Sequence, residues 1–443
     1  MVNPPVRSTL VQRTLARACE IEPQEARATL ASFLLVFLLM GSYYILRPVR
    51  DALASDWSDA EVSWLWTFTF FLSFIAVSLY GTAVSRIRFQ RLVPSVYGLF
   101  AVSFTLFYLG SQTVSERVLL DKAFYLWVSL FSLFHISVFW SFMADTYSKG
   151  QATRLFGFIG AGASAGGIAG PAAASFLVSD YGTDSLLLIA SILIVLTLPI
   201  IRWLQHLKST DLHNENITAD AADLTIGGSA MAGFSEFLNS RYLLAIGLFI
   251  FFYTFIGSFV YFELKNLLAI YDRETRSQIW ANMDLVVNSL TILVALFATG
   301  RMAKYLGLPF TLASVPVLIG AGMMILAAAP IIGVVVAVQI IRRAGNYAIS
   351  RPAREILFTA VDRETRFKAK PVIDIVVYRG GDMLSAWVFT GLTQGLGMGL
   401  ASVALVGAGV AAVWAVTGIY LGRRFLTMEP TPMAPTMNLK LNS

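Results

Sequence analysis

The sequence has few charged residues, a single cysteine and only three histidines. Charged residues make up 14% of its 443 positions and hydrophobic residues 56%, whereas a soluble domain of this length needs more charge to cover its surface. The lone Cys19 excludes an intrachain disulfide and a zinc or iron–sulfur site built from several cysteines. The composition therefore excludes a soluble globular protein.

Several sequence motifs typical of nucleotide-binding proteins, metalloenzymes and hydrolases are also missing. The chain has no G-x-x-x-x-G-K-[ST] loop for nucleotide phosphates, no paired histidine–acid metal motif and no nucleophile elbow. We therefore expect no enzyme activity, no metal and no cofactor. The net charge of +6 does not indicate nucleic acid, because basic residues that gather between apolar segments serve to fix membrane topology.

The sequence does contain long apolar runs of roughly 18–25 residues, the length that crosses about 30 Å of hydrocarbon as a helix. A membrane β-barrel would show short alternating segments instead. The pattern predicts an all-α membrane protein with twelve transmembrane helices, which we place at 28–53, 61–84, 92–112, 122–144, 156–178, 184–204, 241–264, 278–299, 309–329, 331–350, 371–394 and 399–422.

A polar stretch in the middle of the chain divides these helices into two sets of six. We expect an N-terminal segment 1–27, a six-helix bundle 28–204, a linker 205–240, a second bundle 241–426 and a disordered tail 427–443. Lysine and arginine gather in alternate loops, which places both termini and the linker in the cytoplasm. The leader lacks a signal-peptide cleavage site, so we expect the first helix to stay in the protein. We expect a multi-pass protein of the bacterial inner membrane.

The two halves share a loop pattern. Helix 61–84 runs into Gly81-Thr-Ala-Val-Ser-Arg-Ile-Arg88, and helix 278–299 runs into Gly300-Arg-Met-Ala-Lys-Tyr-Leu-Gly307. Both resemble the glycine-plus-basic loop of the major facilitator superfamily in degenerate form. Two six-helix halves with matching loops predict the fold of that superfamily.

Small residues line one face of helix 156–178. Gly162, Gly166 and Gly170 recur every four residues, and such a stripe lets another helix approach closely. Gly157, Gly166, Gly170 and Pro171 also have the spacing G-x8-G-x3-G-P, which resembles the helix-5 motif of antiporters in that superfamily. Simple helix packing and a role in exchange both explain the pattern.

The pattern R-P-x-R-[DE] occurs twice, as Arg47 to Asp51 at the end of the first helix and as Arg351 to Glu355 at the end of the tenth. In each copy the first arginine and the acid are four residues apart and share a helix face. We interpret the copies as matching gates at opposite mouths of a central cavity. The alternative is that they are interface residues that close helix ends.

Arginines outnumber acids in the apolar segments, and guanidinium groups pair well with phosphate or carboxylate. The predicted substrate-binding residues are Arg47, Arg50, Arg342, Arg343, Asn346 and Arg379. The predicted gating residues and counter-charges are Asp51, Asp145, Asp284, Arg351, Arg354, Glu355 and Asp382. His135 is a candidate proton relay, although a lone histidine in an apolar helix is more often a packed residue. Asp272 and Asp362 each begin an Asp-Arg-Glu-Thr-Arg repeat and are read as helix caps.

Three segments together resemble the ATP/ADP translocase family of plastids and intracellular bacteria. They are Tyr44-Ile-Leu-Arg-Pro-Val-Arg-Asp-Ala-Leu53, Gln151-Ala-Thr-Arg-Leu-Phe-Gly157, and Arg351-Pro-Ala-Arg-Glu355 through Tyr378-Arg-Gly-Gly-Asp382. That family belongs to the major facilitator superfamily and exchanges nucleotides. Arg50-Asp51 matches a Lys-Asp pair that is important for transport there, with lysine changed to arginine.

The resemblance implies an antiporter that exchanges nucleotides or other organic phosphate anions by alternating access. Its expected partners are a small anionic solute and membrane lipid, and we expect a monomer. A proton-coupled drug exporter is an alternative, although it would need surplus acid. A lipid flippase or a non-transporting membrane partner protein also stays open.

Overall fold

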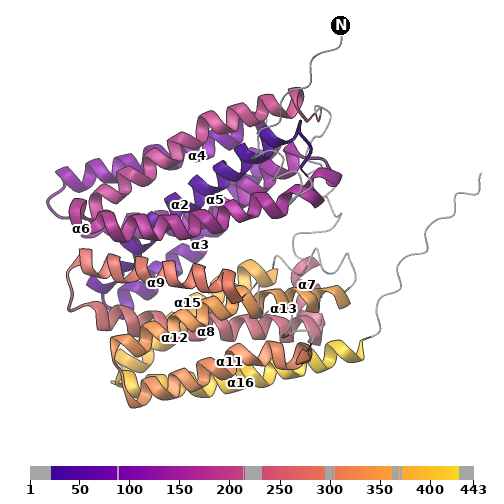
Figure 1. Ribbon diagram of the computed structural model, residues 1–443. Coiled ribbons are helices and arrows are strands. Elements are labelled where there is room, and N and C mark those ends of the chain that lie inside the picture. The colour runs from indigo at the N-terminus through magenta and orange to yellow at the C-terminus, as the bar shows by residue number, and fades with distance from the viewer. Residues whose placement is uncertain are drawn as a thin grey trace, which may run out of the picture. The chain divides into compact units, whose positions relative to one another are not determined.

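The computed structural model describes residues 21–86, 89–212, 214, 232–294, 302, 305–361, 369 and 372–428. The described part is helical throughout and contains no strand (Figure 1). The long helices are α2 (Ala26–Leu53), α3 (Asp59–Arg86), α4 (Phe89–Thr113), α5 (Val118–Thr146), α6 (Lys149–Thr210), α8 (Arg241–Leu268), α9 (Arg273–Val294), α11 (Gly307–Ala328) and α16 (Leu400–Thr427).

Two further runs join several helical segments. One passes from α12 (Ile332–Gly345) through the π-helical turn η3 (Asn346–Ser350) into α13 (Arg351–Leu357). The other passes from η5 (Val372–Val377) through α15 (Tyr378–Thr390) to η6 (Gly391–Gly395). A short helix, α7 (Ala232–Asn239), lies within the predicted linker.

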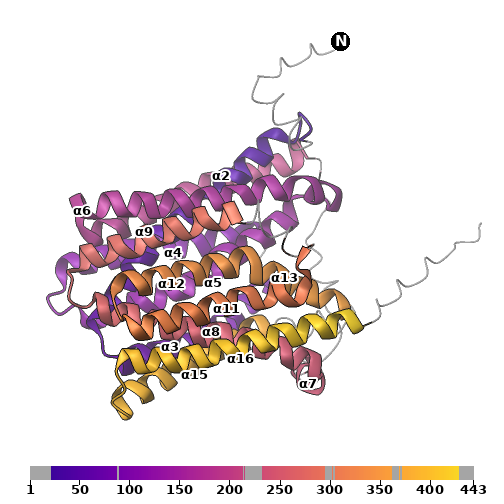
Figure 2. The same ribbon diagram turned by 60° about the horizontal axis from the view of Figure 1, so that its bottom comes forward.

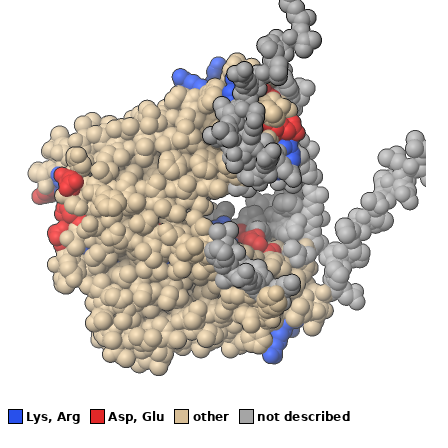
Figure 3. Space-filling model, in the orientation of Figure 1, with Lys and Arg blue, Asp and Glu red and all other residues tan. Residues whose placement is uncertain are grey.

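Eight of the described helices are long and apolar enough to cross a membrane. One of them, 154–210, is long enough for two crossings at about 1.5 Å per residue. Gly182, with a φ of 73°, interrupts its helical backbone, so α6 supplies the two predicted helices 156–178 and 184–204. With α3, α9 and the run 372–395, the described part contains the twelve predicted helices. On the face drawn in Figure 3, most charged side chains lie toward the helix ends.

The helices group into two compact units. The first unit contains residues 1–225 and 262–290, and the second contains 226–261 and 291–443. In the first unit α2 packs mainly against α6, and in the second α11 packs mainly against α16, as both ribbon views show (Figures 1 and 2). The predicted division into bundles 28–204 and 241–426 stays a prediction.

The glycine stripe of α6 lies against the backbone of α2. A Cβ atom at Gly162 would come within 2.5 Å of the carbonyl oxygen of Phe33, and one at Gly170 within 2.6 Å of that of Gly41. A Cβ at Gly166 would collide with the carbonyl oxygen of Phe37. At these three glycines a side chain would therefore leave no room for α2, and the absence of one lets the two helices pack closely. Gly157 and Pro171 also lie within α6, and the role in exchange stays a prediction.

The tenth helix is longer than predicted. We expected it to end at residue 350, but the helical run continues to Leu357. In η3 the N–H of Arg351 bonds to the carbonyl of Asn346, five residues back, so the helix widens just before Pro352, which has no N–H to donate. The second R-P-x-R-E copy therefore lies inside a continuing helix rather than beyond its end.

Candidate functional site

Four charged residues of the first unit form one group, which we call the α2 cluster: the half-buried Arg47 and Arg50 and the buried Asp51 and Asp284. Arg47 lies 3.5 Å from both Asp51 and Asp284. Arg50 lies 2.6 Å from Asp51. Both carboxylates are 1% exposed. Two positive and two negative charges balance, so in this conformation both predicted substrate-binding arginines of α2 are held by acids.

Polar and aromatic groups from other helices of the first unit surround this cluster. Arg50 lies 5.4 Å from the centre of the Tyr125 ring and contacts the Ser129 hydroxyl. Asn288, one turn beyond Asp284 on α9, accepts a hydrogen bond from Tyr44 and donates one to the Gly167 carbonyl. Such groups are costly inside a membrane unless they pair with one another, and here they do.

Arg342 of the second unit has different surroundings. Its Nε donates to the Gln339 side-chain oxygen at 2.9 Å, and its guanidinium lies 5.1 Å from the centre of the Tyr253 ring. The side chain is buried, with 7% exposed. No carboxylate of the described residues lies within ion-pair distance of it. We call Arg342, Gln339, Tyr253 and the adjacent Gly257 the Arg342 site.

Gly257 of α8 leaves room for this arginine. A Cβ atom at residue 257 would lie 2.7 Å from Arg342 Nη1. The Tyr253 ring lies 6.2 Å from that of Tyr378 and 6.1 Å from that of Trp414. The site thus places a guanidinium that has no carboxylate partner among the described residues beside a group of aromatic rings.

The other predicted residues of the second unit have different surroundings from one another. Arg343 is buried on α12, and Asn346 begins the π-helical turn. Arg379 lies 3.7 Å from Asp382, as their spacing suggests. In the described parts of 332–395, five arginines face only three acids, so positive charge is in excess there.

One predicted pairing differs from the structure. Glu355 pairs with Arg354 at 3.2 Å rather than with Arg351, which is exposed. Arg354 also lies 3.3 Å from Asp374. The ion pair between the first arginine and the acid four residues later is therefore present in the first copy of the motif, and the second copy does not repeat it.

Asp145 lies apart from the α2 cluster. It is near the end of α5, sixteen residues beyond Ser129, which is about 24 Å along a helix. It pairs with Lys208 of α6 at 3.0 Å. Asp145 therefore lies in the last turn of its helix, and its gating role stays a prediction.

Sequence reasoning missed a set of ion pairs at one end of the first unit, which we call the helix-end pairs. Lys265 lies 2.8 Å from Asp59. Arg273 lies 2.8 Å from Asp56 and 2.9 Å from Asp121, and Arg276 also pairs with Asp56. The only signal in the sequence was charge next to apolar runs, since several partners are over 200 residues apart.

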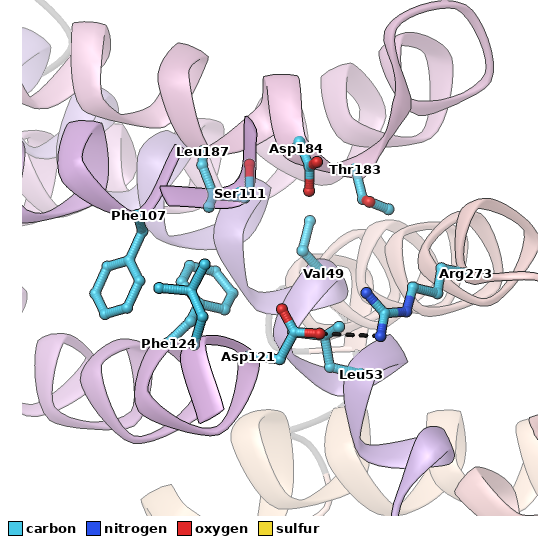
Figure 4. A pocket seen from close by; sticks show the side chains of 11 residues that line it. Val49, Leu53, Phe107, Ser111, Asp121, Phe124, Thr183, Asp184, Leu187 and Arg273 are labelled. Atoms are coloured by element: carbon cyan, nitrogen blue, oxygen red, sulfur yellow. Dashed lines mark ion pairs between the residues drawn. The ribbon is translucent and has the colours of Figure 1, made fainter. Parts of the chain in front are cut away.

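Figure 4 shows the pocket beside the Asp121–Arg273 pair, with Phe107 and Leu187 lining its apolar side. Its free volume is about 20 Å³, room for about one water molecule. It is therefore too small for an organic solute.

The remaining candidates lie outside these groups. His135 is buried and stacks on Tyr43 at 4.6 Å, with its Nδ1 3.1 Å from the Phe131 carbonyl, which fits a packed residue. Asp272 accepts hydrogen bonds from the Thr275 N–H and hydroxyl at 2.8 Å, which lowers the pKa of its carboxyl and confirms it as a helix cap. Asp362 lies outside the described residues.

The family model described as "Major Facilitator Superfamily" matches residues 32–355. No curated protein matches the sequence. Among solved structures, the nucleoside transporter NupG has a TM-score of 0.61 at 14% identity, covering 90% of this chain and 99% of its own.

Two other solved structures have a similar fold. A bacterial homologue of the human lysosomal transporter Spinster has a TM-score of 0.59 at 14% identity, covering 93% of this chain and 100% of its own. A POT family transporter in complex with 5-aminolevulinic acid has a TM-score of 0.63 at 12% identity, covering 90% of this chain and 96% of its own. Likeness at such low identity concerns the fold alone.

Proposed function

Because the chain belongs to the major facilitator superfamily and is a membrane transporter, we propose that it exchanges organic phosphate anions, with nucleotides first among them. We also propose that it works as an antiporter by alternating access. Its proposed setting is a bacterial inner membrane with both termini in the cytoplasm, which the distribution of basic loops supports.

The observation that supports an anionic substrate is the set of groups around Arg342. A buried guanidinium is costly unless a partner offsets its lost hydration. Arg342 has an amide oxygen and an aromatic ring as partners, and no carboxylate among the described residues. A phosphate that reaches this side chain gains a charge-assisted, bidentate partner without first displacing an acid.

The rings beside Arg342 support a planar organic part in the substrate. The Tyr253 ring lies near the rings of Tyr378 and Trp414 in the second unit. Aromatic faces stack on nucleobases of any kind. In this proposal Arg342 and Arg343 hold the phosphates and Tyr253 or Tyr378 contacts the base.

The α2 cluster has a second role in the proposed cycle. In the conformation described here Asp51 and Asp284 hold Arg47 and Arg50. A phosphate that approaches these arginines competes with the carboxylates, so binding can be coupled to the exchange of ion pairs. Arg354, Glu355, Arg379 and Asp382 are the proposed counterparts in the second unit.

Reconstitution tests the proposal directly. Purified protein is placed in liposomes loaded with ADP, and uptake of labelled ATP is followed against liposomes without internal nucleotide. The proposal predicts uptake that depends on internal ADP and is lost in Arg342→Gln. A surface variant, Arg423→Gln, at an exposed residue near the end of α16, is the matched control and should transport normally. Equal uptake by empty and loaded liposomes would refute exchange.

A further inference from the structure

A glutamate inside α8 has no partner in the described structure. Glu263 is 0% exposed, as are its neighbours Phe262 and Leu264. Neither carboxyl oxygen has a hydrogen-bond partner, and the side chain forms no ion pair with any described residue. A carboxylate in such a place is very unfavourable, so a group with this environment is stable only as the neutral acid.

The charged groups around this part of α8 are engaged elsewhere. α3 contacts α8 here, since the rings of Trp66 and Phe262 lie 5.4 Å apart. The acids at the start of α3 are paired, Asp59 with Lys265 and Glu61 with Lys122.

Lys265 is the nearest cation along α8, and its ammonium is also bonded to the Trp57 carbonyl and the Asn266 side chain. The arginines of α9, Arg273 and Arg276, both pair with Asp56. None of these cations is therefore placed to neutralise an ionised Glu263.

A buried acid with no hydrogen bond contributes nothing to packing that an apolar residue would not contribute better. A role in proton movement does explain it, because alternating access changes which side chains meet water. We propose that Glu263 is a proton-binding site: its carboxylate takes a proton from water in one conformation of the transport cycle and carries it, buried, in the conformation described here. This inference rests on the proposed exchange and extends it to proton-coupled transport.

Infrared spectroscopy of the purified, reconstituted protein tests proton binding without any substrate. The C=O band of a protonated carboxylic acid should be present in the wild type, absent in Glu263→Gln, and unchanged in Glu61→Gln, the control. In D2O the band should shift as the proton exchanges with solvent. A spectrum that Glu263→Gln leaves unchanged overturns the proposal, and a band that never exchanges shows a static acid and overturns it too.

Transport in liposomes with a trapped pH-sensitive dye then tests coupling, with ADP and ATP as the probes. We expect a nucleotide gradient to move protons in the wild type, and at least a tenfold smaller movement in Glu263→Gln at an unchanged melting temperature. Proton movement that is equal in both proteins contradicts coupling through Glu263. Failure of nucleotide exchange alone would refute the proposed substrate and leave the infrared result to decide on proton binding.

Discussion

Both units have arginines with little exposed surface on their long helices, but the partners of these arginines differ. Arg47 and Arg50 of the first unit lie against Asp51 and Asp284. Arg342 of the second unit lies against an amide and a tyrosine ring. In the first unit the arginine charges are neutralised within the protein, whereas the Arg342 guanidinium of the second unit is stabilised by neutral groups, with no carboxylate partner among the described residues.

This difference separates two roles that the sequence could not separate. A paired arginine must lose its acid before it binds an anion, so its pairs are suited to switching between conformations. An arginine held by neutral groups keeps its charge available for a ligand. We therefore assign primary anion recognition to Arg342 and a conformational role to the α2 cluster.

The largest expected effect is that of Arg342→Gln. Removing a buried, charge-assisted partner of a phosphate costs about 2–5 kcal/mol, so ATP uptake into ADP-loaded liposomes should fall on the order of 100-fold. Uptake by the Arg342→Lys variant should fall less, because lysine keeps the positive charge but lacks the planar guanidinium group. Transport near the wild-type rate in Arg342→Gln would remove the contrast between the two units.

Asp51→Asn addresses the paired side of the comparison. It leaves Arg50 without its carboxylate, and breaking a buried pair on one side costs roughly 3–5 kcal/mol, so the melting temperature of the detergent-purified protein should drop clearly. The double variant Arg50→Gln/Asp51→Asn should be more stable than the two single effects added together. Additive losses would show that the two side chains do not interact in the folded protein.

Gly166→Ala tests how rigidly the first unit holds α2. The new methyl group would collide with the carbonyl oxygen of Phe37, a backbone atom that cannot move alone, so we expect a loss of about 1–3 kcal/mol in stability. Gly160→Ala on the same helix is the matched control, since its methyl group would meet only Trp140 at 4.0 Å. Equal melting temperatures for the two variants would argue against close packing.

Gly257→Ala should have the smallest effect on stability. Its main effect should be on how tightly the protein binds its ligand. The added methyl group would meet Arg342 Nη1, the flexible end of a side chain, so the arginine can move aside at a cost of about 1 kcal/mol or less. Displacing Arg342 should raise the concentration of ATP needed for half-maximal uptake several-fold. An unchanged value would place the anion away from this guanidinium.

Much of the fold could be predicted from local sequence. Apolar runs gave the twelve helices, and the spacing of Gly162, Gly166 and Gly170 predicted a close helix contact, because both features repeat over a few residues. The predicted end of the tenth helix was wrong, since the helix continues to Leu357. A π-helical turn precedes Pro352 and lets the helix continue past it, and the width of a helical turn cannot be read from the sequence.

Less of the candidate site could be predicted, because partner choice is a long-range property. The pairing of Arg47 with Asp51 follows from i, i+4 spacing, yet the same spacing in Arg351 and Glu355 gives no pair because Arg354 takes the acid. The Lys265–Asp59 pair joins residues about 200 positions apart. Glu263 carried no local signal, since its isolation depends on how its surroundings pack.

Ligand-dependent melting of the purified protein tests the central claim most directly, because a ligand that binds only the folded state raises its melting temperature. ATP should stabilise the wild type, adenosine should not, and ATP should have little effect on Arg342→Gln. An equal ATP shift in the wild type and in Arg342→Gln would contradict the assignment of anion recognition to Arg342.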